Sequence, residues 1–80
     1  MAEQSEIANL LPRLAELRRN ASRARRLALA ANTAAEIHNL ATYAENLDRE
    51  ADAIEVRLAI LRAAIAASAS SQDVAALIAS

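Results

Sequence analysis

Residues 37–65 read IHNLATYAENLDREADAIEVRLAILRAAI. Nine apolar residues in this stretch follow one another at alternating intervals of three and four. They are Ile37, Leu40, Ala44, Leu47, Ala51, Ile54, Leu58, Leu61 and Ile65, and we call them the second seam. This spacing places all nine on one face of a long helix. A helix with one narrow apolar stripe must lay that stripe against another helix.

The partner helix is indicated earlier in the chain by an equally regular pattern. Its apolar positions, the first seam, are Ile7, Leu10, Leu14, Leu17, Ala21, Ala24, Ala28 and Ala31. The two seams differ in phase by two residues, a shift that one continuous paired helix does not absorb. We therefore expect a turn at Asn32-Thr33, where Asn32 can end one helix in the left-handed conformation and Thr33 with Glu36 has capping-box spacing. A turn this short makes the two helices antiparallel.

Composition agrees with a helical protein. The 80 residues include no Gly, one Pro, one aromatic residue and 23 Ala, which disfavours a sheet and favours helix. We expect a single all-α domain: an antiparallel helical hairpin of coiled-coil type with a short C-terminal third helix. A chain of this length buries a thin core, so dimerisation into a helical bundle would supplement it.

The expected boundaries are a helix over about 12–31, a turn at 32–33, a helix over about 34–67 and a short helix over about 71–79. Pro12 leaves the first boundary open, because it would either kink a helix that starts near Ser5 or open the main helix. The Ser-rich stretch 68–71 interrupts the apolar pattern, and within it Ser70 has capping spacing to Asp73, which predicts the start of a new helix. The third helix, folded back, would cover Val56 and Ile60.

Charges favour pairing between the two halves of the chain. Residues 1–31 hold six Arg against three acids, whereas residues 32–80 hold three Arg against seven acids. In the expected hairpin Arg18 comes opposite Asp48, and Arg13 comes opposite Glu50. Exposed ion pairs contribute only about 0.2–1 kcal/mol each, so they select the pairing more than they stabilise it.

Motifs of enzymes and metal proteins are missing from the sequence. There is no Cys, and His38 is the only histidine, so zinc lacks its usual ligands. The carboxylates alternate with Arg and fit a solvated helix face, and no His or acid is arranged around any Ser to activate it. We therefore expect no enzyme, no cofactor and no metal. The acidic start of the chain and the lack of a long apolar run predict a cytoplasmic protein without a membrane span.

By elimination, the leading hypothesis is a helical protein–protein interaction module, such as an adaptor, small chaperone or assembly subunit. Five apolar residues outside the seams are its candidate contact residues: Leu11, Leu27, Leu29, Val56 and Ile60. The partner would be another protein or a second copy, and we expect a homodimer through Leu27 and Leu29, where neighbouring Ala residues permit close approach.

Two alternatives come from other classes. The first is a weak nucleic-acid-binding regulator, because five cations fall within nine residues: Arg18, Arg19, Arg23, Arg25 and Arg26. A net charge of −1 and the absence of stacking aromatic residues in this run make nucleic acid an unfavoured partner. The second is a designed helical bundle without a natural function, suggested by the uninterrupted seams and the absence of Gly and Lys.

Overall fold

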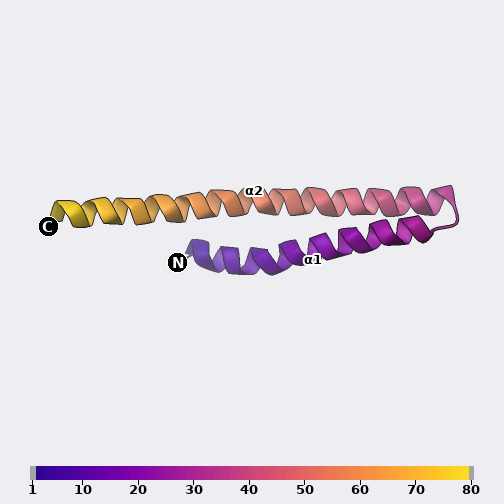
Figure 1. The fold of residues 1–80 in the computed structure, drawn as a ribbon, viewed down its shortest axis with the longest axis horizontal. Coiled ribbons are helices and arrows are strands. Elements are labelled where there is room, and N and C mark those ends of the chain that lie inside the picture. The colour runs from indigo at the N-terminus through magenta and orange to yellow at the C-terminus, as the bar shows by residue number, and fades with distance from the viewer. Residues whose placement is uncertain (1, 80) are drawn as a thin grey trace.

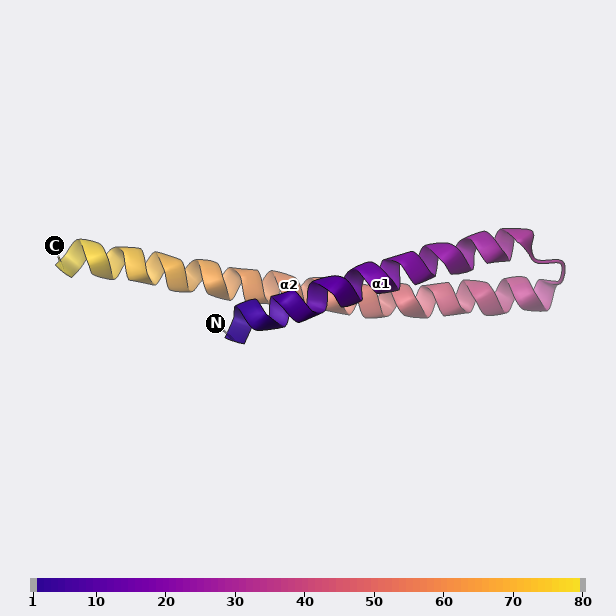
Figure 2. The same cartoon turned by 90° about the horizontal axis from the view of Figure 1, so that it is seen from below.

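The protein is an antiparallel pair of helices, α1 (Ala2–Ala30) and α2 (Ala34–Ala79). This description comes from a computed structural model, which describes the backbone of residues 2–79 and the side chains of residues 2–69 and 78. Figure 1 shows the two helices side by side, joined at one end of the molecule, and Figure 2 shows α1 passing across α2. The all-α class and the hairpin topology expected from the sequence are confirmed, and the described residues contain no strand.

Residues 31–33 form the turn, and local hydrogen bonds hold it. The Glu36 amide donates to the Thr33 hydroxyl oxygen at 3.1 Å, and the Asn32 amide donates to the Glu36 carboxylate at 3.4 Å. Thr33 therefore caps α2 as its spacing predicted. The prediction that Asn32 adopts the left-handed conformation is wrong, because none of the described residues has a positive φ. Instead α1 tightens at its end, where the Ala31 amide donates to the Ala28 carbonyl at 3.3 Å.

The core is the line where the two seams meet. Among the described side chains eight apolar residues are buried, and every one was predicted as a seam position: Leu17, Ala21, Ala24, Ala44, Leu47, Ala51, Leu58 and Leu61. Leu17, Ala21, Leu47 and Ala51 form its central cluster, with Leu14 and Ile54 packed against it. Four of the eight are Ala, so the interface is narrow and the hairpin gains little from burial.

One seam position is exposed. Ile37 is 45% exposed, although the seam pattern placed it in the core. It lies one turn into α2, opposite the end of α1, where Ala31 has left the helix and offers only a methyl group. The spacing correctly identifies the face on which Ile37 lies, but the neighbouring helix ends too early and with too small a side chain to cover it.

The start of α1 lies well before residue 12. The helix begins at Ala2 and continues through Pro12 rather than being opened by it. Pro12 has no amide hydrogen and therefore removes one helical hydrogen bond. Ile7 and Leu10, both half-buried, lie in the segment before it. Their packing on α2, together with an ion pair at Glu6, offsets this loss and keeps the segment helical.

The C-terminal part of the chain also differs from the expectation. α2 runs to Ala79 as one helix, without the break predicted over residues 68–71 and without a separate third helix at 71–79. Ser is only moderately unfavourable inside a helix, and the flanking Ala residues are the best helix formers. The side chains of Val74 and Leu77 lie outside the described residues, but Val56 and Ile60 are 61% and 54% exposed, so the predicted cover is absent.

Because α2 is much longer than α1, it projects beyond the start of α1 as a single helix (Figure 1). The molecule measures 70 × 15 × 14 Å and has a radius of gyration of 19.6 Å. A compact domain of this length would have a radius of gyration of about 11.6 Å. Most residues therefore have solvent on one side, and the faces turned away from the seam are available for contacts.

Candidate interaction surfaces

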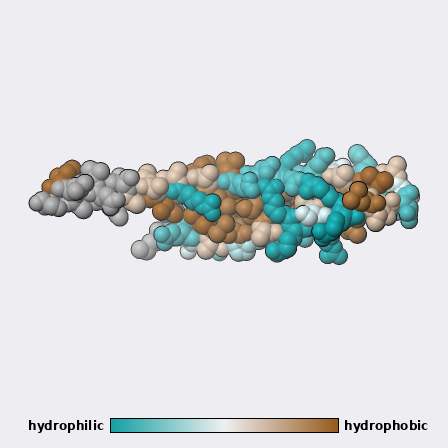
Figure 3. All heavy atoms as spheres, viewed as in Figure 1, coloured by the Kyte–Doolittle hydropathy of each residue, from teal (hydrophilic) through white to brown (hydrophobic). Residues whose placement is uncertain are grey.

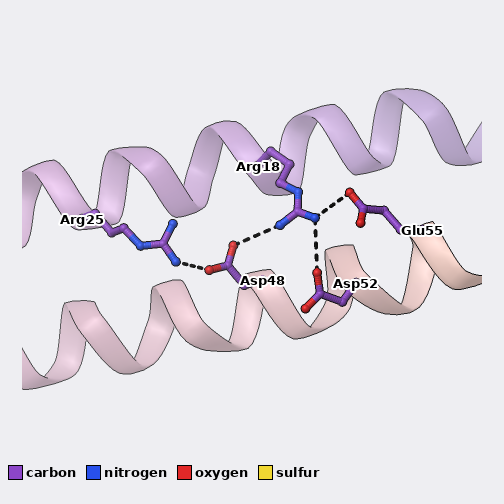
Figure 4. A network of polar contacts seen from close by, with 5 residues as sticks. All are labelled: Arg18, Arg25, Asp48, Asp52 and Glu55. Atoms are coloured by element: carbon purple, nitrogen blue, oxygen red, sulfur yellow. Dashed lines mark hydrogen bonds and ion pairs between the residues drawn. The ribbon is translucent and has the colours of Figure 1, made fainter.

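Ion pairs line one side of the helix interface, and Arg18 on α1 is their centre (Figure 4). Its guanidinium donates to Glu55 at 2.6 Å, to Asp52 at 3.2 Å and to Asp48 at 3.5 Å, all on α2. Arg25 approaches the second oxygen of Asp48 from the next turns of α1. Arg18 can serve three carboxylates because its planar guanidinium carries several donors.

The opposite side of the interface carries two further pairs. Arg57 donates to both carboxylate oxygens of Glu6, at 2.7 and 2.9 Å, and Arg13 donates to Glu50 at 3.3 Å. The Arg18–Asp48 and Arg13–Glu50 contacts predicted from the sequence are therefore both present. The two sides together favour this register, because shifting α1 by one turn would separate Arg57 from Glu6 and Arg13 from Glu50.

The strongest pairs change the pKa of their members. The hydrogen bond from Arg57 holds the pKa of Glu6 below its ordinary value, and Glu6 in turn raises the pKa of Arg57. The hydrogen bond to Glu55 raises the pKa of Arg18 further, with a smaller contribution from Asp52. Glu6, Arg18 and Arg57 face water and stay fully charged near neutral pH. The ion pairs select which helix α1 packs against and in which register, since exposed pairs add little to stability.

The ion pairs also reduce the number of unpaired cations in the Arg-rich run of α1, residues 18–26. Arg18 and Arg25 are engaged by acids of α2, so two of the five cations are neutralised within the chain. Among the described residues, no ion pair involves Arg19, Arg23 or Arg26. These three remain on the exposed side of α1, beside a shallow depression that also includes Asn20 and Ser22.

The five predicted apolar contact residues are all exposed, but the structure does not bring them together. Leu11 lies on α1 beside Glu55 and Arg62, and Leu27 borders a groove with Tyr43. Leu29 is 89% exposed and lies by Ala41. Leu27 and Leu29 thus border separate grooves on opposite flanks of α1.

Only Val56 and Ile60, one helical turn apart, share a face, on the side of α2 away from α1. Figure 3 shows the distribution of such surface in one view. Apolar surface gathers toward both ends of the described hairpin, while hydrophilic side chains cover its middle.

Comparisons with protein families, curated proteins and solved structures find no match. The exposed surfaces are therefore the observations from which a function can be argued.

The described residues hold neither a metal-binding cluster nor a membrane-spanning helix. No group of three or more His, Cys, Asp or Glu side chains there is placed to hold a metal ion, and His38 is exposed near the turn. Within the same residues, no helix is long and apolar enough to cross a membrane.

Four contacts between the helices were not predicted from the sequence: Arg18 with Asp52, Arg18 with Glu55, Arg25 with Asp48, and Arg57 with Glu6. A signal for the second was present. Asp48 and Glu55 are seven residues apart on the same flank of the second seam, so a long side chain opposite them can reach both. The prediction paired Arg18 only with the residue directly opposite, Asp48, and so did not include Glu55.

Proposed function

We propose that the chain is a non-enzymatic protein–protein interaction module that acts by presenting apolar helix faces to a partner helix. The observation that carries the proposal is the exposure of Val56 and Ile60 on the same face of α2, at 61% and 54%. Their neighbours in register, Ala53 and Ala63, are also exposed and small. An apolar stripe on a helix face is how helices recognise one another.

The thin core supports the proposal from a second direction. In the part of the chain whose side chains are described, the helices bury four Leu and four Ala between them, and this burial has to offset the entropy of ordering about 80 residues. Small domains of this kind gain stability from a partner that covers further apolar surface. The exposed stripe of α2 is available for such a partner.

Site-specific crosslinking tests this proposal. A photoreactive side chain in place of Ile60 should form a covalent protein adduct in cells that produce the chain, because the partner helix would lie against it. The same group in place of Asn39, three heptads earlier on the same exposed face of α2, is the matched control. Adducts that are absent at Ile60, or equally abundant at Asn39, would contradict the proposal.

A nucleic-acid-binding regulator is the second candidate, and the exposed trio of Arg19, Arg23 and Arg26 is the observation that favours it. Three free cations support at most a non-specific affinity in the range of about 10⁻⁴–10⁻⁶ M at physiological salt. We expect binding to a generic duplex no tighter than that.

The salt dependence of that binding identifies its source. If the trio contacts phosphates, Arg23→Ala with Arg26→Ala should lower the slope of log affinity against log salt by roughly two, since each phosphate contact contributes about 0.9. Arg49→Ala with Arg62→Ala removes the same charge from α2 and should leave the slope nearly unchanged. Submicromolar binding at physiological salt, lost only with the α1 pair, would rank this candidate first.

A further inference from the structure

The face of α2 that points away from α1 repeats the spacing of the buried second seam. Intervals of three and four connect eight positions, which we call the outer seam: Ala53, Val56, Ile60, Ala63, Ala67, Ser70, Val74 and Leu77. Seven of the eight residues are apolar and the eighth is Ser. Because α2 is one helix through Ala79, all eight share a register position on a single face. The first five are exposed in the structure.

Nothing within the described chain covers this face. Leu58 and Leu61, on the other side of α2, are each only 3% exposed because α1 packs there. The remainder of α2 cannot fold back, since it continues as the same helix that carries the outer seam. No segment within residues 2–79 is therefore left to cover the outer seam.

The exposed area of the chain is large enough for such an interface. Its accessible surface is 5874 Å², whereas a compact protein of 8.5 kDa exposes about 4,700 Å². The excess of about 1,200 Å² exceeds the roughly 800 Å² that each partner buries in a standard interface. A second chain could cover that excess without displacing α1.

The order of side-chain sizes along the outer seam makes it complementary to itself when reversed. With two copies antiparallel and centred between Ala63 and Ala67, Ala53 faces Leu77. In the same register, Val56 faces Val74 and Ile60 faces Ser70. These three layers each combine a large residue with a small one, or two of medium size, and so have similar thickness. The two central layers pair Ala63 with Ala67, where the backbones can approach more closely.

Other arrangements fit less well. In a parallel pair Ile60 would face Ile60 and Ala63 would face Ala63, which alternates wide layers with narrow ones and leaves gaps. In an antiparallel pair shifted by one heptad, the polar Arg49 would enter the apolar line or two seam residues would lose their partners. The one unfavourable contact of the centred register, Asp52 near Asp73, falls at its edge, where water and salt screen like charges.

We propose that the outer seam binds a second copy of this chain, with the two α2 helices antiparallel and centred between Ala63 and Ala67. This inference rests on the proposed function and names its partner. The single-helix projection of each copy then lies along the hairpin part of the other. Where the two α2 helices overlap, each also packs on its own α1 on one side of the centre, so a cross-section there holds three helices, and the two turns lie at opposite ends.

Sedimentation equilibrium across micromolar concentrations measures the association. The mass should rise from 8.5 kDa toward twice that value. Ile60→Glu should weaken the dimer on the order of 100-fold, because it buries a charge in the interface. Leu29→Glu is the matched control, because it also replaces an exposed aliphatic side chain on a helix with a carboxylate. It should leave the association unchanged. Circular dichroism of both variants should show intact helix, since neither residue belongs to the core.

Disulfide trapping measures the register. Because the sequence has no native Cys, only the introduced thiols can form a disulfide. A mixture of Ala63→Cys and Ala67→Cys chains should oxidise to the mixed dimer, because those positions face each other across the two-fold axis. Ala53→Cys alone should remain a free thiol. Rapid crosslinking of Ala53→Cys to itself would establish a parallel pair and overturn the inference.

Two further outcomes would overturn the second copy as partner. One is a mass that stays at 8.5 kDa at every concentration, and the other is a dimer that dissociates with Leu29→Glu but not with Ile60→Glu. These results leave the proposed function separately testable. A photoadduct at Ile60 with a mass other than twice that of the chain would keep the interaction module and replace its partner, whereas no adduct at all would remove both.

Discussion

Leu17→Ala should lower the free energy of unfolding by about 2–5 kcal/mol, the usual cost of deleting a fully buried leucine side chain. Leu17 is 1% exposed and is the one large side chain among the described residues that the fold buries completely. It lies in the central cluster with Ala21, Leu47 and Ala51, none of which can move to fill the cavity without leaving its helix register. Since small domains are only marginally stable, this loss should unfold a large fraction of the protein at room temperature.

The measurement is thermal and urea unfolding followed by helical circular dichroism, at one fixed protein concentration so that any association contributes equally. Leu29→Ala provides the matched control on the same helix. Leu29 is almost fully exposed, and alanine is the better helix former, so stability should be unchanged or slightly higher. Equal destabilisation by the two substitutions would mean that the first seam does not face α2.

Ala51→Leu should also destabilise the hairpin strongly, for the opposite reason. Ala51 has no exposed surface and lies where the two backbones are close. Three additional carbon atoms at this point must force the helices apart or adopt strained rotamers, at a typical cost of about 1–3 kcal/mol. The loss should appear as a lower unfolding midpoint in the same measurement.

Ala15→Leu on the exposed side of α1 is the control for that change, because it adds the same atoms where no helix opposes them. Its midpoint should stay near that of the parent chain. A stable Ala51→Leu variant would indicate that the helices can separate freely at the centre, which would contradict a seam held together by close approach.

The sequence predicts the core of this fold well because the core depends on period alone. Along the full paired length of each helix, only one face is apolar at intervals of three and four, and this pattern predicted that Leu17 and Leu47 are in the core. The phase shift between the seams required the turn, and Thr33 marked its end. Arg18 and Asp48 were then paired by counting residues outward from that turn.

Features that depend on small energy differences were less accessible. Pro12 and the Ser-rich stretch 68–71 each disfavour helix locally, but the packing of Ile7 and Leu10 in one case and flanking alanines in the other outweigh them. Reading residues 71–79 as a separate helix also concealed the outer seam, because Val56 and Val74 then belonged to different elements. The line through them is visible only once α2 is known to be continuous.

The ion pairs of the hairpin are ordered along it in a way that bears on mechanical unfolding. Their sequence separations grow from 23 at Arg25–Asp48 to 30 at Arg18–Asp48, 37 at Arg13–Glu50 and 51 at Arg57–Glu6. A force that draws the start of α1 away from α2 therefore loads Arg57–Glu6 first and the pair nearest the turn last. The hairpin should yield as a zipper, one layer at a time and at low force. A force along the helix axes would instead load all layers at once in shear.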